Sequence, residues 1–277
     1  MVSCDGVDIM VTDHGPIDGE PVLLIHGFPD SARLWRNQIP VLAEAGYRVI
    51  APDLRGFGRS DTPEEVSQYD MSVVMADMLR VLDESGLSDV HLVGHDWGAV
   101  VAWALAARSG RVRSLTAFSV GHPGGFLAAG LQQRQKSWYL LLFQFEGVAE
   151  RWLSDNDWYW LRRWSACDEI ENWIGDLSRP GRLTASLNLY RANLPPESVL
   201  AMPREYPPVK VPVMGVWSSG DAALTEKQMT ASGDFVSGGW RYERLEDIGH
   251  WIPLEAAHQT NALLIDWLGS HRQGSRR

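Results

Sequence analysis

The sequence Gly-His-Asp-Trp-Gly at residues 94–98 constrains the fold of this chain most strongly. An apolar run of the kind found in strands precedes it at 90–93, and an apolar helical pattern follows it at 99–105. The glycines allow the strand and the helix to approach closely, while the residue between them sits on a strained turn at the helix N-terminus, which favours an anion. The pattern therefore predicts a nucleophile elbow in which Asp96, as an ionised carboxylate, takes the place of the usual serine.

A carboxylate nucleophile limits the reactions that the site can catalyse. Serine at an elbow attacks acyl carbons, whereas a carboxylate is suited to displacing a leaving group from an alkyl carbon, which leaves an alkyl ester on the enzyme. The esterase, lipase and peptidase classes are therefore disfavoured. The ester must then be hydrolysed, and this step needs a base oriented by a second acid.

Around the elbow, short β-rich runs alternate with helical patterns. We expect strands at 22–25, 47–51, 90–93, 115–120, 211–217 and 240–245, and helices at 31–45, 72–85, 99–108 and 254–268. This order predicts an α/β fold of the α/β-hydrolase type, with a mostly parallel central sheet and helices on both faces. Residues 1–120 and 206–277 are expected to form this core.

Residues 121–205 interrupt the alternation with Trp, Arg and Leu in helical spacings. Six of the 13 tryptophans lie there. A helical insertion between strands would sit over their C-terminal ends, where open α/β folds bind ligands. We therefore predict an inserted helical cap, in which most of these aromatic side chains pack the cap on the core.

The order of elements also predicts the acid and the base. Asp221 follows the strand at 211–217, and no Asp or Glu occurs between Asp96 and Glu146, which excludes an acid one strand earlier. His250 follows the strand at 240–245 and precedes the last helix, so it is the predicted base.

Two backbone N–H groups are expected to stabilise the oxyanion that forms during ester hydrolysis: that of Trp97, directly after the nucleophile, and that of Phe28, in a His-Gly-Phe-Pro loop. The predicted substrate-binding residues are Trp97, Phe28, His122 and Trp251. Of the other histidines, His95 is expected to be structural, and His258 and His271 are expected to be exposed.

These motifs together resemble the α/β-hydrolase superfamily and, within it, the soluble epoxide hydrolases, from about residue 20 to residue 268. The resemblance rests on the elbow, the His-Gly-Phe-Pro loop at 26–29 and Gly-His-Trp at 249–251. It implies that two cap tyrosines, Tyr139 and Tyr190, hydrogen-bond the epoxide oxygen and stabilise the developing alkoxide. The alternative is that both are buried tyrosines with other partners. The resemblance further implies a small apolar epoxide and water as substrates, and no metal or organic cofactor.

Related proteins with the same aspartate provide alternatives. Haloalkane dehalogenases also have Asp-Trp at the elbow, and the indole of Trp97 could bind a halide, but they often use an asparagine where this chain has Phe28. Fluoroacetate dehalogenases need arginines where this chain has Trp97 and Val100. The fold also serves non-catalytic ligand receptors, and in a receptor Asp96→Ala need not abolish the effect.

Composition limits the partners and the compartment. A net charge of -10 argues against nucleic acid or an anionic membrane as the main partner, because both require a basic surface. The chain has only two cysteines, and it shows neither an apolar leader nor a run of about 20 apolar residues. We therefore expect a cytoplasmic protein, with a homo-oligomer left open.

Overall fold

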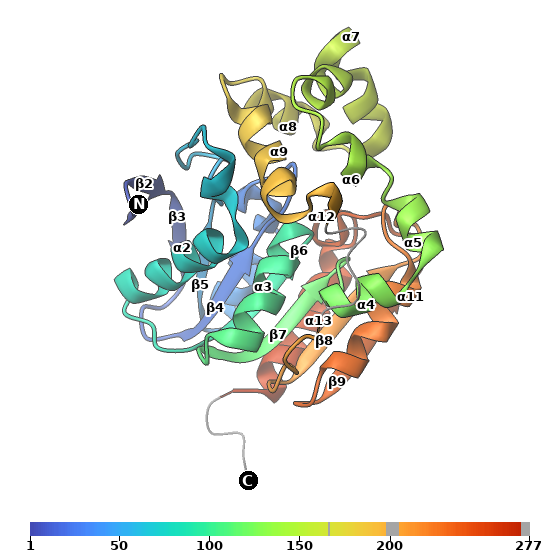
Figure 1. The fold of residues 1–277 in the computed structure, drawn as a ribbon. Coiled ribbons are helices and arrows are strands. Elements are labelled where there is room, and N and C mark those ends of the chain that lie inside the picture. Colours follow the sequence, from blue (N-terminus) through green and yellow to red (C-terminus); the bar gives the residue numbers. More distant parts are fainter. Residues whose placement is uncertain (166, 198–204, 273–277) are drawn as a thin grey trace.

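A mostly parallel sheet organises the computed structural model, which describes residues 1–165, 167–197 and 205–272 (Figure 1). The order in this sheet is β3-β5-β4-β6-β7-β8-β9, and β3 alone among these runs antiparallel to its neighbour. The strands are β3 (Val11–His14), β4 (Glu20–Ile25), β5 (Tyr47–Pro52), β6 (Val90–His95), β7 (Val112–Phe118), β8 (Val213–Ser218) and β9 (Trp240–Leu245). The predicted α/β-hydrolase architecture is confirmed.

Both faces of the sheet are covered, which explains why its central strands are continuously apolar. In β4, Leu23 and Ile25 belong to one hydrophobic core, and Val22 and Leu24 belong to the other, because alternate side chains leave opposite faces of a strand. The first core contains α2 (Met71–Glu84) and α3 (Trp97–Arg108), and the second contains α1 (Ile39–Glu44) and α13 (Ala257–Ser270).

Two helices predicted as continuous are each divided. The segment 31–45 forms η1 (Ala32–Trp35) and then α1, because Pro40 lacks the N–H that would extend a helix through the residues before it. The last helical segment begins with α12 (Ile252–Glu255), and α13 follows after the non-helical Ala256.

Helices replace strands between β7 and β8. They are α4 (Pro123–Ala128), α5 (Leu131–Lys136), α6 (Tyr139–Leu142), α7 (Val148–Ser165), α8 (Ile170–Leu177) and α9 (Arg182–Asn193). In Figure 1, α6 to α9 lie above the end of the sheet at which β6 leads into α3, and α4 packs against α11 (Glu226–Thr230) and η3 (Ala231–Phe235). The helix α7 is kinked by non-helical backbone at residues 155–158.

The remaining elements are peripheral. The strands β1 (Val2–Cys4) and β2 (Val7–Ile9) form a separate antiparallel pair, and η2 (Val66–Tyr69) precedes α2. Across the part of the chain that the structure describes, no helix combines the length and the apolar character that crossing a membrane requires.

Candidate active site

The turn between β6 and α3 has the geometry of a nucleophile elbow. Asp96 has φ 54° and ψ -124°, a backbone conformation that is costly for any residue with a side chain. A Cβ on Gly98 would lie 2.0 Å from the carbonyl oxygen of Ile25, and one on Gly94 would lie 2.4 Å from the carbonyl oxygen of Gly98. Glycine is therefore needed at both positions for the strand and the helix to approach closely.

Two backbone N–H groups act on the Asp96 carboxylate. The N–H of Phe28 donates to Oδ1 of Asp96 at 2.8 Å, and the N–H of Trp97 lowers the pKa of the same carboxyl group. A Cβ on Gly27 would lie 2.3 Å from Oδ1, so only glycine lets the loop come this close. Of the two donors predicted for the oxyanion, the N–H of Phe28 binds Oδ1 of Asp96, and the N–H of Trp97 acts on the same carboxyl group.

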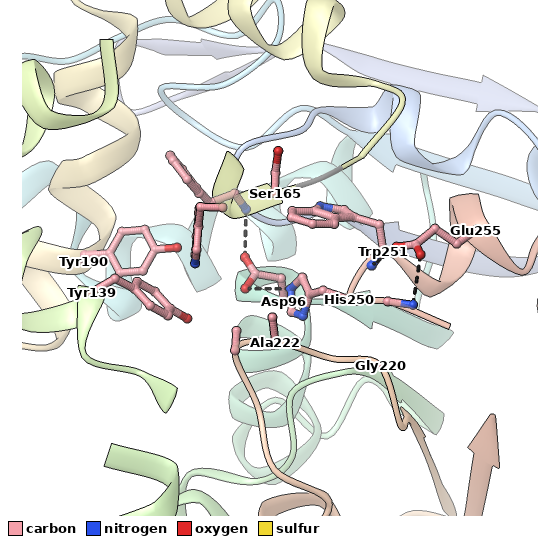
Figure 2. A pocket seen from close by; sticks show the side chains of 13 residues that line it. Asp96, Tyr139, Ser165, Tyr190, Gly220, Ala222, His250, Trp251 and Glu255 are labelled. Carbon is pink, nitrogen blue, oxygen red and sulfur yellow. Dashed lines mark hydrogen bonds and ion pairs between the residues drawn. The ribbon is translucent and has the colours of Figure 1, made fainter. Parts of the chain in front are cut away.

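His250 lies between the two predicted carboxylates. Its Nε2 is 3.6 Å from Oδ2 of Asp96 (Figure 2). Its Nδ1 is 2.8 Å from Oδ2 of Asp221. The other oxygen of Asp221 accepts hydrogen bonds from the backbone N–H groups of Ala223 and Leu224, at 2.8 and 2.9 Å. Asp221 is therefore anchored as a buried carboxylate that orients the imidazole.

The charges in this group stabilise one another. Burial disfavours the imidazolium, but the carboxylates of Asp221 and Asp96 outweigh it and raise the pKa of His250 to about 10. Burial likewise disfavours ionised Asp96, yet His250 and the N–H of Trp97 hold its pKa below the ordinary value. The free site therefore contains an ionised Asp96 beside the imidazolium of His250.

Two tyrosines face this group from the helices α4 to α9 between β7 and β8, which we call the helical segment. Tyr139 begins α6 and Tyr190 lies in α9, and Figure 2 shows both hydroxyls directed towards Asp96. Burial, with the negative charge of Asp96 as the next cause, raises both pKa values well above the ordinary range, so both hydroxyls are protonated donors at neutral pH. The indole of Trp97 packs edge-on against the ring of Tyr190, with ring centres 5.0 Å apart, and acts in the opposite direction on the pKa of that hydroxyl.

A cavity of about 250 Å³ lies between the two tyrosines and Asp96. It is lined by Phe28, Asp96, Tyr139, Trp164, Ser165, Tyr190, Gly220, Ala222, Ala223, Gly249, His250, Trp251 and Glu255. Aromatic rings form one wall, with Trp164 centred 4.8 Å from Tyr139 and 6.4 Å from Phe28. Among the described residues, no group of three or more His, Cys, Asp or Glu side chains is placed to hold a metal ion.

Two predicted pocket residues lie elsewhere. The indole of Trp97 is buried beside Tyr190 and is absent from the described lining, so it supports a tyrosine rather than contacting the cavity. His122 is also absent from it, because its ring is buried against Phe235, with ring centres 4.6 Å apart, and its side chain caps α4. Phe28 and Trp251 do line the cavity.

The other histidines lie largely as expected. His95 is buried, and its Nε2 is 2.9 Å from the carbonyl oxygen of His250. His258 is exposed, whereas His271 is half-buried, because its ring packs on Trp267 at a centre-to-centre distance of 4.1 Å.

Sequence reasoning missed several residues around the site. Glu255 accepts hydrogen bonds from backbone on both sides of His250, and Gln133 and Lys136 of α5 bind the loop that carries Asp221. A glutamate shortly after the start of a helix is a capping signal that could have identified Glu255. No comparable signal marks Gln133 or Lys136, because their partners lie about 90 residues away.

Comparisons with known proteins identify the family. The family model of the α/β-hydrolase fold matches residues 20–257. Epoxide hydrolase A of Mycobacterium tuberculosis is 30% identical over 97% of this chain and 96% of its own length, and the epoxide hydrolase of Caballeronia sordidicola is 30% identical over 96% and 92%.

Solved structures give the same result. Epoxide hydrolase A from Mycobacterium thermoresistibile is 28% identical, with a TM-score of 0.79 over 98% of each chain. The epoxide hydrolase of Bacillus megaterium in complex with an inhibitor is 25% identical, with a TM-score of 0.86 over 97% of this chain and 99% of that one. The present chain thus belongs to the α/β-hydrolase superfamily and, within it, to the epoxide hydrolase family.

Proposed function

We propose that this hydrolase converts a small apolar epoxide and water into a vicinal diol through a covalent ester on Asp96. The observation that carries the proposal is the position of two protonated tyrosine hydroxyls across a cavity from an ionised carboxylate. An epoxide bound between them would place its oxygen at the hydroxyls and a ring carbon at the carboxylate. The apolar wall and the modest volume of the cavity support a small apolar substrate.

In the first step, Asp96 attacks a ring carbon. We assign the attack to Oδ2, because the N–H of Phe28 already binds Oδ1. The ring C–O bond breaks as the new bond forms, and the leaving oxygen takes a proton from Tyr139 or Tyr190. Hydrogen bonds from both hydroxyls to the developing alkoxide lower the barrier, since an alkoxide is a poor leaving group. The product is a hydroxyalkyl ester.

Ester formation prepares the base. It removes the negative charge of Asp96, which is one of the two carboxylates that raise the pKa of His250. The imidazolium therefore becomes more acidic, and the proton that it releases can replace the one given up by the tyrosine. His250 is then neutral, and Asp221 holds it for the second step.

In the second step, His250 takes a proton from a water molecule that attacks the carbonyl carbon of the ester. Oδ1 becomes the oxyanion, and the N–H groups of Phe28 and Trp97 stabilise it. Collapse of the intermediate breaks the bond between the carbonyl carbon and the alkoxy oxygen, which takes the proton from His250. The diol leaves. The carboxyl group of Asp96, which now carries the oxygen and the remaining proton of the water molecule, passes that proton to His250, and this restores the carboxylate and the imidazolium of the free site.

The same structure weakens the haloalkane dehalogenase alternative. A halide would need side-chain donors near the nucleophile, but the indole of Trp97 is buried beside Tyr190 and is absent from the described lining of the cavity, and Phe28 contributes only a hydrocarbon ring. Both cysteines, Cys4 and Cys167, are free and buried, which supports a reducing compartment such as the cytoplasm as the place where the protein works.

The test is the intact mass of His250→Gln protein after incubation with pooled epoxides and, separately, with pooled 1-haloalkanes. We expect a gain equal to one whole epoxide, on a peptide that contains Asp96. A gain equal to an alkyl group without its halogen would instead make the protein a dehalogenase. Folded protein that gains no mass from either pool would contradict the covalent mechanism and favour the receptor alternative.

A further inference from the structure

We propose that Glu255 is a positioning residue for the hydrolytic step, because it fixes the backbone on both sides of the base His250. This inference rests on the proposed two-step mechanism. The carboxylate of Glu255 accepts hydrogen bonds from the N–H of Gly249 at 2.9 Å and from the N–H of Trp251 at 3.1 Å. One side chain therefore holds the peptide groups that flank the base.

The carbonyl groups of the same loop are held from the sheet. His95, at the end of β6, and Ser119, after β7, contact the carbonyl oxygen of His250 through Nε2 and Oγ, at 2.9 and 2.7 Å. Ser218, at the end of β8, donates from Oγ to the carbonyl oxygen of Gly249 at 2.7 Å. The sheet thus fixes the acceptors of the loop, and Glu255 fixes its donors from the opposite direction.

Gly249 gives independent support for this arrangement. A Cβ at this position would lie 2.6 Å from Oε2 of Glu255, closer than real Cβ contacts. The backbone of Gly249 does not have a positive φ, so conformational freedom is not the reason for glycine here. The absence of a side chain at Gly249 makes room for the carboxylate of Glu255.

The two steps of the mechanism depend on this loop to different extents. Attack on the epoxide needs Asp96 and the tyrosines, whose positions come from other elements. Activation of water needs the imidazole of His250 at a set distance from the ester, and its Nε2 now lies 3.6 Å from Oδ2 of Asp96. A small displacement of the loop should therefore slow hydrolysis and leave alkylation almost unchanged.

Glu255→Gln tests this proposal. The glutamine oxygen can accept only one of the two N–H groups, and its amide NH₂ then faces the other. Because Glu255 is solvent-exposed, we expect the variant to fold. With a single epoxide that alkylates His250→Gln, single-turnover mass spectrometry should show alkylation within about twofold of wild type and hydrolysis slower on the order of 10- to 100-fold. The ester should accumulate, and kcat and KM should fall together, so that kcat/KM stays constant.

A second variant and a control sharpen the test. Gly249→Ala should push the carboxylate away and reproduce the accumulation of ester, although Glu255 itself is unchanged. Asp247→Asn removes one negative charge from the loop between β9 and α12 that also carries His250, and it leaves both N–H groups unchanged. Asparagine tolerates the positive φ of 57° at this position. This control should keep wild-type rates for both steps.

The outcomes separate the two proposals. If His250→Gln accumulates the ester and Glu255→Gln hydrolyses it at the wild-type rate, the role of Glu255 is wrong and the mechanism stands. A fall in kcat/KM without accumulation of ester would also overturn it, since this is the signature of general damage to the fold. If His250→Gln itself gains no mass from any epoxide, the failure lies with the proposed function.

Discussion

The two sides of the cavity are built by different means. On the sheet side, hydrogen bonds and restricted backbone fix Asp96, His250 and Asp221, and each of these side chains has a partner within 3 Å. On the helical side, Tyr139 and Tyr190 are placed mainly by ring packing, with Phe143 centred 5.4 and 5.0 Å from them. Directional contacts therefore position Asp96, His250 and Asp221, whereas the packing of ring shapes positions the two tyrosines.

This difference has a chemical reason. Nucleophilic attack and general base catalysis need angles and distances held within tenths of an ångström, which hydrogen bonds provide. Ring packing is less directional, and substitutions that conserve volume change it more gradually. We therefore expect substitutions on the sheet side to abolish a step of the reaction. Substitutions on the helical side should instead lower its rate by amounts that depend on how much the packing changes.

The largest expected effect is that of Asp96→Ala. Without the carboxylate no ester can form, so turnover should fall on the order of 10⁴-fold or more. Mass spectrometry in the background of His250→Gln should show no adduct. An adduct on a different residue would show that the sheet side contains another nucleophile, and it would contradict the contrast between the two sides of the cavity.

Tyr139→Phe and Tyr190→Phe should each slow alkylation on the order of 10²-fold, because each removes one donor to the developing alkoxide. Hydrolysis of the ester should be unaffected, which single-turnover kinetics can measure. Trp97→Phe should reproduce part of the effect of Tyr190→Phe, since it removes the indole that packs edge-on against the ring of Tyr190, with ring centres 5.0 Å apart. Equal slowing of both steps would contradict the separation of roles.

Phe143→Ala should have a smaller effect on catalysis and a clear effect on stability. Phe143 is fully buried among Phe28, Tyr139, Tyr190 and Trp164. Truncation should lower the free energy of unfolding by about 3–5 kcal/mol and slow alkylation about tenfold as the tyrosines lose their support. Denaturant unfolding and single-turnover rates measure both quantities.

The matched control for Phe143→Ala is Leu268→Ala. Leu268 is equally buried, but it belongs to the other core, on the far face of the sheet. This variant should lose comparable stability and retain the wild-type rate of alkylation. A slower alkylation rate in Leu268→Ala would mean that stability alone controls the position of the tyrosines.

The smallest expected effect is a pH dependence of stability. The pKa of His250 rises from 6.5 to about 10 on folding, through Asp221 and Asp96 acting against burial, so the folded state binds the proton more tightly. Its contribution is complete below pH 6.5 and is lost as the pH rises towards 10. The Tm advantage of wild type over His250→Gln should therefore shrink by a few degrees across that range, while Tyr190→Phe should follow wild type. A constant advantage would contradict the raised pKa.

The elbow and the order of strands were predictable from the sequence, because they depend on local patterns: glycine spacing and apolar runs that are buried on both faces. The roles of Asp96, Asp221 and His250 remain predictions, and the structure brings these side chains together. The divided helix at 31–45 was missed because the helical spacing of apolar residues continues across Pro40. His122 was misplaced because its partner Phe235 lies more than 100 residues away.

Contacts between the helical segment and the core were the least predictable part of the site. Gln133 is fully buried, donates to the carbonyl oxygen of Ala223 at 3.0 Å and accepts from the N–H of Thr225 at 2.8 Å. Lys136 donates to the carbonyl oxygen of Asp221 at 2.5 Å. Residue type alone would place a lysine and a glutamine at the surface, and only the fold brings them to this loop.

These contacts matter for chimeric enzymes in which the helical segment comes from a relative. Helix α5 ends three residues before Tyr139, and its side chains hold the loop that carries Asp221. An exchange of the helical segment with that of a relative would therefore alter the support of the triad as well as the binding surface. We expect a chimera that keeps both Gln133 and Thr225 to retain hydrolysis of the ester. These two residues should therefore be preserved when the helical segment is exchanged to change the substrate range.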